Sequence, residues 1–214
     1  TTISDHPAIV FELANIPRTI EATSYSLDAG GRINFNSNGT SYASVGFRAK
    51  IGKTVGIVTA GHAVKLNEVA YIGGTAVGKC TISKQGGTAD AAFVKTYSNC
   101  TPTNSLVGST YVLSTQTSQP GAGTIINFKG SVSGVKDGVI VSTNASDTFN
   151  GYSYTNLTTA TYTSTKGDSG GIIYTYISSK DIRYTVGIHL GRIGNTRYYS
   201  KADNVLSTLG ASRY

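Results

Sequence analysis

With 214 residues, the chain is long enough to bury one large hydrophobic core or two small ones. Only 14% of the residues are charged, whereas 26 are Gly and 14 are Tyr, a composition typical of an all-β protein with many tight turns. The formal net charge of +7 comes from scattered Lys and Arg, and no apolar run reaches 18 residues, so we expect neither nucleic acid nor a membrane as a partner.

Residues 1–29 differ from the rest of the chain. A short apolar run over residues 8–13 is followed by Pro17 and a polar stretch, so we expect an N-terminal arm or the remnant of a pro-segment. The first strands are expected after Gly30, each bounded by Gly or Asn residues that are typical of turns. These strands cover residues 42–47, 55–60, 68–72, 77–83 and 91–97.

A polar stretch from Asn99 to Ser109 predicts the join between two halves, residues 30–105 and 106–214. The second half repeats the pattern of the first. Strands at regular intervals, with no helix-length amphipathic window between them, favour barrels or a sandwich. The later strands are expected over residues 110–114, 123–129, 135–142, 152–162, 171–177, 183–189 and 196–199.

One helix is expected, close to the C-terminus. Ser200 can cap its first turn, and Asp203 would complete a Ser-x-x-Asp capping box. Gly210 would end the helix. Its apolar face would be formed by Val205, Leu206 and Leu209.

A glycine-rich serine motif, Gly167-Asp168-Ser169-Gly170-Gly171, precedes a β-branched, aromatic strand. Glycines on both sides of the serine permit positive φ angles and let a substrate carbonyl approach the main chain closely. In such a turn the amides of Gly167 and Ser169 can point at one spot, which is how a backbone oxyanion hole is built. The alternative is a loop that merely joins two strands.

A catalytic base for this serine must come from one of three histidines. His6 lies in the N-terminal arm, His62 follows a buried-looking strand, and His189 lies late in the second half. Asp90 opens an apolar strand, where a carboxylate could be buried against an imidazole. The alternative reading of His62 and Asp90 is a core histidine and an ordinary aspartate at a strand end.

Together these segments resemble the chymotrypsin-fold serine peptidases, specifically the secreted bacterial branch of α-lytic protease and the streptogrisins. The resemblance covers about residues 30–214. It implies an all-β fold of two packed antiparallel six-stranded β-barrels with a C-terminal helix. His62 and Asp90 would lie in domain 30–105, and Ser169 in domain 106–214. The residues that carry the resemblance are 43–47, 59–62, 90–94, 167–171 and the C-terminal helix.

The resemblance implies a secreted serine endopeptidase, made as a zymogen, that acts on protein or peptide substrates. Ser169 would attack the peptide carbonyl, His62 would accept its proton, and Asp90 would hold the imidazole. The amides of Gly167 and Ser169 would form the oxyanion hole. This chemistry implies no cofactor and no metal, and we expect a monomer.

Substrate choice would come from the residues before Ser169 and from the strand that ends near His189. By resemblance to glutamyl endopeptidases, His189 would read the substrate side chain. The residues assigned to the same site are Ser164, Lys166, Arg192 and Tyr199.

A histidine donor with two nearby cations stabilises a carboxylate through charge-assisted hydrogen bonds, so we expect cleavage after Glu, with Asp weaker. Several alternatives stand beside this one. A neutral His189 could read the amide of Gln, or His189 could be a strand histidine satisfied by its neighbours. The enzyme could also prefer small or apolar residues, or the chain could be a catalytically silent binding protein with the same fold.

Two departures from the relatives concern cysteines and charges. The disulfide beside the catalytic histidine is replaced by Ala43 and Ala63, and the secreted-enzyme interpretation instead predicts a Cys80–Cys100 disulfide. The alternative is two unpaired, buried thiols.

The other departure concerns Asp168. In animal relatives, the counterpart of Asp168 pairs with a freshly cut N-terminus. Here we expect an internal cation, Lys129, to pair with Asp168.

Overall fold

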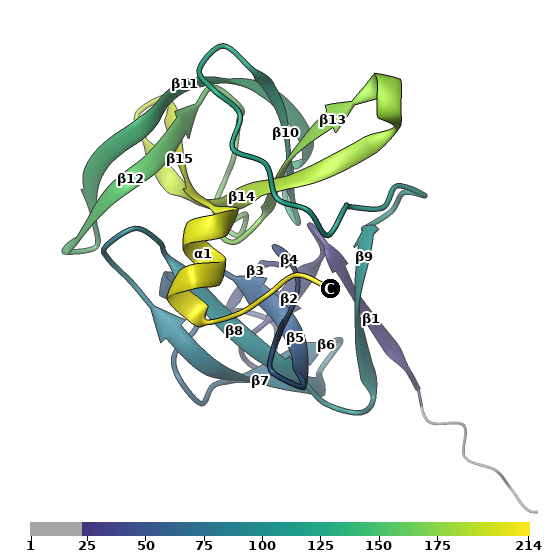
Figure 1. The fold of residues 1–214 in the computed structure, drawn as a ribbon. Helices are drawn as coiled ribbons and strands as arrows, with labels where there is room; N and C mark the ends of the chain where they lie inside the picture. Colours follow the sequence, from purple (N-terminus) through teal and green to yellow (C-terminus); the bar gives the residue numbers. More distant parts are fainter. Residues whose placement is uncertain (1–22) are drawn as a thin grey trace, which may run out of the picture.

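The computed structural model describes residues 23–214 (Figure 1). The strands form a seven-stranded sheet in the first half, a closed six-stranded barrel in the second half, and a separate two-stranded pair. The predicted fold class, two packed β domains with a C-terminal helix, is confirmed. The first half differs in detail, because its sheet has seven strands rather than six. Residues 1–22, with His6 and most of the predicted arm, lie outside the described part of the chain.

The sheet of the first half has the order β3-β2-β6-β7-β8-β5-β4 and is antiparallel throughout. A 3-10 helix, η1 (Gly61–Ala63), follows β5 and carries His62. One face of the sheet covers a core made mainly of β-branched and small side chains. The strands are β2 (Arg32–Asn34), β3 (Tyr42–Ser44), β4 (Phe47–Ile51), β5 (Thr54–Thr59), β6 (Val69–Ile72), β7 (Thr75–Lys84) and β8 (Ala91–Thr96).

A parallel pair of strands, β1 (Tyr25–Ala29) and β9 (Cys100–Leu106), lies at one side of the two halves (Figure 1). The polar stretch predicted to be a join is therefore largely a strand. In β9, the first, third and last residues (Cys100, Pro102 and Leu106) are buried, so this polar segment packs against the core. Pro102 is tolerated in β9 because this strand pairs with β1 alone.

The second half is a closed barrel with the order β10-β11-β12-β15-β14-β13, so none of its strands has an open edge. Its interior is filled by aromatic and β-branched side chains. The longest strand, β11, forms a hairpin with β12 whose tip contains Phe149 and Asn150. The strands are β10 (Ile125–Gly130), β11 (Gly134–Phe149), β12 (Tyr152–Ala160), β13 (Ile172–Ile177), β14 (Ile182–Ile193) and β15 (Thr196–Lys201).

The predicted helix is present as α1 (Ala202–Leu209) and ends at Gly210, whose φ is 61°. Figure 1 shows α1 in front of the junction between the two halves. The predicted cap is wrong, because the Ser200 hydroxyl accepts a hydrogen bond from the Asp90 amide (3.0 Å) instead of capping the helix. Asp203 accepts hydrogen bonds from a separate loop rather than completing a capping box. Ser200 therefore belongs to the surroundings of Asp90.

The expected disulfide is wrong, because Cys80 and Cys100 are both free and both buried. Each thiol packs as a small apolar group in the core of the first half, and the Cys80 Sγ donates to the carbonyl of Ile82 (3.4 Å). Burial raises the pKa of both thiols to about 11, so the thiolate needed for disulfide formation is scarce at neutral pH. This region is held by packing rather than by a covalent bridge.

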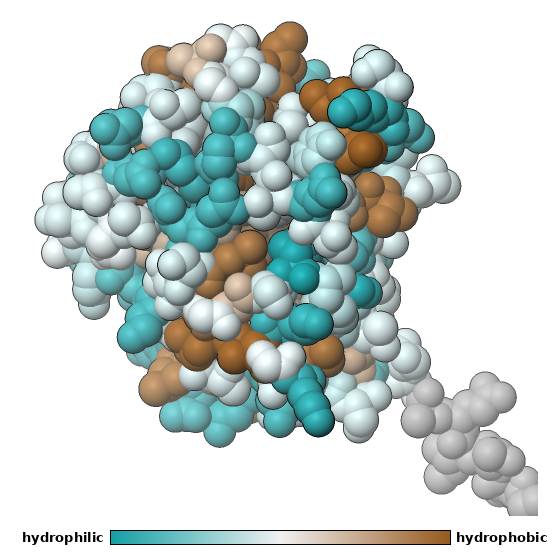
Figure 2. Space-filling view, in the orientation of Figure 1, coloured by the Kyte–Doolittle hydropathy of each residue, from teal (hydrophilic) through white to brown (hydrophobic). Residues whose placement is uncertain are grey.

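The surface of the described residues is mixed in polarity. On the face shown in Figure 2, apolar side chains form small patches between polar ones. Exposed valines on the outer side of the barrel include Val135 and Val141. No helix within residues 23–214 is long and apolar enough to cross a membrane.

The two halves meet across a shared apolar cluster. Phe47 and Phe93 from the first half pack there with Ile172 and Ile188 from the second. Gly46 lies at one close approach between them, where a Cβ atom would come within 2.6 Å of the Ile188 Cγ2 atom. This contact helps to fix how the first half sits against β14.

Replacing Gly46 with Ala should therefore destabilise the protein by about 1–3 kcal/mol, because the added methyl group overpacks this contact. Chemical denaturation would measure the change in the free energy of unfolding. Gly121→Ala is the matched control, since its Cβ would meet no atom within 4 Å. Equal stability of the two variants would contradict the tight contact.

Candidate active site

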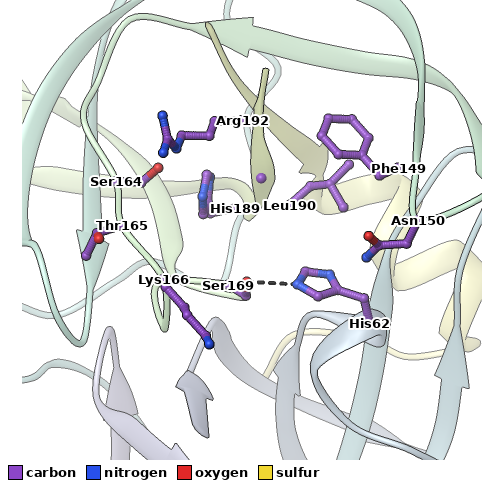
Figure 3. Close-up of a pocket in the computed structure, with 11 residues that line it drawn as sticks. His62, Phe149, Asn150, Ser164, Thr165, Lys166, Ser169, His189, Leu190 and Arg192 are labelled. Carbon is purple, nitrogen blue, oxygen red and sulfur yellow. Dashed lines mark hydrogen bonds between the residues drawn. The ribbon is translucent and has the colours of Figure 1, made fainter. Parts of the chain in front are cut away.

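The structure brings together the three side chains expected to form the catalytic centre. His62 lies on η1, Asp90 directly precedes β8, and Ser169 lies in the turn before β13. The Nδ1 atom of His62 is 2.5 Å from the Oδ2 atom of Asp90. Its Nε2 atom is 2.8 Å from the Oγ atom of Ser169, the contact drawn in Figure 3. This arrangement connects an alcohol to a buried carboxylate through one imidazole.

Hydrogen bonds to both its side chain and its main chain hold Asp90 in place. Its side chain has no exposure to solvent, and its Oδ1 atom accepts a hydrogen bond from the His62 amide (2.9 Å). Its own amide donates to Ser200 (3.0 Å). The Tyr154 hydroxyl lies 3.4 Å from the same Oδ1 atom. The sequence offered no local signal for Ser200 or Tyr154, because both come from distant strands.

The environment of His62 changes its proton affinity. Burial lowers the pKa of His62, but the hydrogen bond and the negative charge of Asp90 act in the opposite direction and outweigh it. The pKa of His62 therefore lies above its ordinary value of 6.5. A histidine in this range can take a proton from an alcohol and return it to a leaving group.

The turn that carries Ser169 leaves two amides available. Gly167 has a φ of 97°, and its carbonyl is held by the hydroxyls of Ser44 (3.0 Å) and Ser131 (3.3 Å). Among residues 23–214, the amides of Gly167 and Ser169 donate to no protein acceptor. Two unpaired amides beside a serine hydroxyl can stabilise a negatively charged oxygen.

Asp168 is buried next to Ser169 and is stabilised without a cation. It accepts hydrogen bonds from the amides of Thr165 (2.8 Å), Val132 (3.0 Å) and Ser133 (3.1 Å), and from the hydroxyl of Ser133 (2.5 Å). No ion pair involving Asp168 occurs within the described part of the chain.

The predicted pairing of Asp168 with Lys129 is therefore wrong. The Lys129 side chain lies instead against Gly30 of the first half. The dense set of main-chain donors around the carboxylate takes the place of the expected cation.

An open cavity of about 310 Å³ lies beside Ser169 (Figure 3). The structure places four of the five predicted substrate-binding residues around it: His189, Ser164, Lys166 and Arg192. Tyr199 is the exception, because it is 1% exposed and packs in the barrel core on the strand opposite His189. Thr165, Leu190 and Gly191, from the two segments expected to form the site, line it as well. The sequence analysis missed Phe149 and Asn150.

His189 is almost completely buried at the cavity and is neutral. Its Nδ1 atom lies 2.8 Å from the Tyr162 hydroxyl, and burial lowers the pKa of His189 to about 3. Burial also raises the pKa of Tyr162, so this hydroxyl keeps its proton. If the Tyr162 hydroxyl donates to Nδ1, the proton of the neutral His189 ring lies on Nε2.

The two predicted cations differ in orientation. In Figure 3, Arg192 and Ser164 lie on the same side of His189, whereas the Lys166 ammonium points away from His189 and past Ser169. Lys166 also lines a second cavity, together with Tyr42 and Ala63. Of the two predicted cations, Arg192 is thus the one on the His189 side of the cavity.

The titratable side chains of the site do not form a metal-binding group. Within residues 23–214, no three His, Cys, Asp or Glu side chains cluster closely enough to hold a metal ion. The polar groups described above account for the contacts of the site.

Comparisons with known proteins identify similar solved structures, although no family model matches the chain. Thermobifida fusca protease A is 23% identical, with 88% of this chain and 98% of that chain covered and a TM-score of 0.75. Nocardiopsis protease is 26% identical, with 88% and 98% covered and a TM-score of 0.74. A glutamic acid specific serine protease described as using a histidine triad in substrate binding is 25% identical, with 87% and 100% covered and a TM-score of 0.73.

These similarities confirm the predicted resemblance to bacterial chymotrypsin-fold serine proteases. They support a chymotrypsin-like serine endopeptidase whose substrates are peptides or proteins.

Replacing Asp90 with Asn should lower the pKa of His62 below 6.5, because the charge that raises it is removed while the burial that lowers it remains. A histidine NMR titration would measure this pKa. Asp147→Asn, which alters a carboxylate bonded to Tyr198, should leave the pKa of His62 unchanged. A His62 pKa that stays above 6.5 in the Asp90 variant would refute this account of the pair.

Proposed function

We propose that this protein is a secreted serine endopeptidase that cleaves after Glu, with Asp accepted less well. It would be made as a zymogen and act as a monomer, with residues 30–105 contributing His62 and Asp90 and residues 106–214 contributing Ser169. The continuous hydrogen-bonded path from Asp90 through His62 to Ser169 is the observation that carries the proposal. The similarity to serine proteases supports the same reaction class.

In the proposed reaction, the Ser169 Oγ atom attacks the carbonyl carbon of the peptide bond while its proton passes to the Nε2 atom of His62. The carbonyl oxygen becomes an oxyanion that accepts hydrogen bonds from the amides of Gly167 and Ser169. When the C–N bond breaks, His62 gives the proton to the leaving amine and an acyl-enzyme remains. Water then attacks the ester, again with His62 as base, and Ser169 recovers its proton.

The preference for Glu rests on the donors that surround the cavity. The Nε2–H group of His189, the hydroxyl of Ser164 and the guanidinium of Arg192 can each donate to a carboxylate. The residues that line the cavity include no Asp or Glu. A basic side chain would therefore face cations and unpaired donors, so cleavage after Lys or Arg is disfavoured.

The similar glutamic acid specific protease is described as using a histidine triad. In this chain the Nδ1 atom of His189 lies 2.8 Å from a tyrosine hydroxyl, that of Tyr162. A tyrosine donor fixes which nitrogen of His189 carries the proton, which is the role we assign to it here.

A preference for Gln is the second candidate, and the neutral state of His189 favours it. A neutral imidazole with a proton on Nε2 can donate to the carbonyl oxygen of an amide as readily as to a carboxylate. Arg192 decides between the two candidates, because its charge stabilises Glu but contributes little to Gln.

Arg192→Ala should therefore lower kcat/KM for a peptide with Glu before the cleaved bond by roughly tenfold or more, because a charge-assisted hydrogen bond is lost. The matched peptide with Gln should change little. Lys136→Ala, which removes an exposed cation from β11, controls for the change in net charge. Equal losses for both peptides, or native cleavage after Leu, Phe or Lys, would contradict the Glu preference.

Diisopropyl fluorophosphate should label the protein once, at Ser169, because among residues 23–214 this is the only serine hydroxyl bonded to an imidazole. Mass spectrometry of the labelled peptide would locate the modification. His62→Ala should abolish the labelling, whereas replacing the exposed Ser146 with Ala should not affect it. No labelling of the native protein would favour a catalytically silent binding protein with the same fold.

A further inference from the structure

The Asp90 carboxylate has no contact with solvent, so its charge must be stabilised by hydrogen bonds from the protein. His62 supplies two of them, from its ring to Oδ2 (2.5 Å) and from its amide to Oδ1 (2.9 Å). Among the residues that the structure describes, one other donor reaches the carboxylate, the hydroxyl of Tyr154, 3.4 Å from Oδ1. Tyr154 lies on β12 and thus comes from the opposite half of the protein.

The Tyr154 side chain is firmly held. It is 1% exposed, its ring meets Phe149 edge to face with centroids 6.1 Å apart, and it packs against Leu157 and Leu190. Burial, together with the charge of Asp90, keeps the pKa of Tyr154 well above its ordinary value of 10. The hydroxyl therefore keeps its proton and acts as a donor at any pH at which the enzyme would work.

The main chain around Tyr154 is also joined to the loop that leads into Asp90. The Gly87 amide donates to the carbonyl of Ser153 (2.9 Å), and the Thr155 amide donates to the carbonyl of Gly87 (2.8 Å). Gly87 lies shortly before Asp90 and has a φ of 68°, a conformation that favours glycine. These two bonds hold the loop against β12 on both sides of Tyr154.

We propose that Tyr154 is a positioning residue that orients the Asp90 carboxylate toward His62 from the opposite half of the protein. The expected kinetic effects rest on the proposed peptidase function, whereas the contact between Tyr154 and Asp90 does not depend on it. A separation of 3.4 Å is long for an O–H···O hydrogen bond. Catalytic hydrogen bonds of this kind are often long in the free enzyme and shorten in the substrate complex.

The contact has an electrostatic consequence with a definite sign. A donor at Oδ1 draws negative charge away from Oδ2, which weakens the effect of Asp90 on His62. Removing the hydroxyl should therefore raise the pKa of His62 further above its ordinary value. A role confined to packing would leave this pKa unchanged. The titratable and charged groups that face this pair or line the same cavity are Tyr154, His189, Lys166 and Arg192.

The test is Tyr154→Phe, which keeps the ring and removes only the hydroxyl. We expect kcat to fall about tenfold with KM nearly unchanged, since the lost bond orients a catalytic group rather than the substrate. The acid limb of the kcat/KM profile should move to higher pH. Tyr198→Phe is the matched control, because it removes a tyrosine hydroxyl bonded to Asp147 (2.8 Å) from the same packed cluster.

A second readout is independent of peptidase activity. In a Ser169→Ala background, a histidine NMR titration should show a higher His62 pKa in Tyr154→Phe than in Tyr198→Phe. An unchanged His62 pKa, or a loss of activity without a shift of the acid limb, would overturn the inference. Absence of peptidase activity in the native protein would instead overturn the proposed function and leave the titration result standing.

A third variant tests the inference even if Tyr154→Phe does not fold. Placing 3-fluorotyrosine at position 154 keeps the hydroxyl and makes it more acidic, so it donates more strongly to Asp90. The pKa of His62 should then fall, the opposite direction to the phenylalanine variant. A rise or no change would count against Tyr154 as the donor.

Discussion

The hydrogen bond between the buried Asp90 carboxylate and the His62 ring is the interaction on which the rest of the site depends. At 2.5 Å it joins a group without solvent contact to an imidazole that remains partly accessible. A carboxylate in such a position is stable only when donors surround it, and the chain supplies them from η1 and β12, while Ser200 at the end of β15 accepts from the Asp90 amide. The outcome is an imidazole with a raised pKa, held 2.8 Å from the Ser169 hydroxyl.

This arrangement requires the two halves of the protein to meet in one way only. The shared apolar cluster and the close approach at Gly46 set their relative position, because side chains from both halves fill the same space. Polar contacts then refine it. Ser44 from the first half holds the carbonyl of Gly167, and Gly87 is bonded to the main chain on both sides of Tyr154. Packing and hydrogen bonds thus act on the same few loops, which are the loops that carry the reactive groups.

The two histidines beside Ser169 have opposite pKa shifts. His62 is paired with a carboxylate, which raises its pKa, whereas His189 has a neutral hydroxyl as its partner and burial lowers its pKa to about 3. In the proposed function, His62 would carry the proton and His189 would be a fixed donor. Such a donor would suit either a carboxylate or an amide, and the charge of Arg192 would distinguish the two.

Local signals in the sequence predicted the β architecture and the C-terminal helix, because strand alternation and glycine-flanked turns depend on adjacent residues. They also marked His62, Asp90 and Ser169 as candidates, whose roles came from the resemblance to serine peptidases. The errors share one cause. Whether the cysteines bond, what stabilises Asp168, what Ser200 binds and whether Tyr199 reaches the cavity all depend on residues far away in the sequence. Tyr154 and Tyr162 escaped notice for the same reason, since a tyrosine at the site and a tyrosine in a core look alike until the chain is folded. The sequence thus determines which reactive groups are present, and folding determines which neighbours tune them, because charge and hydrogen bonding act through space rather than along the chain.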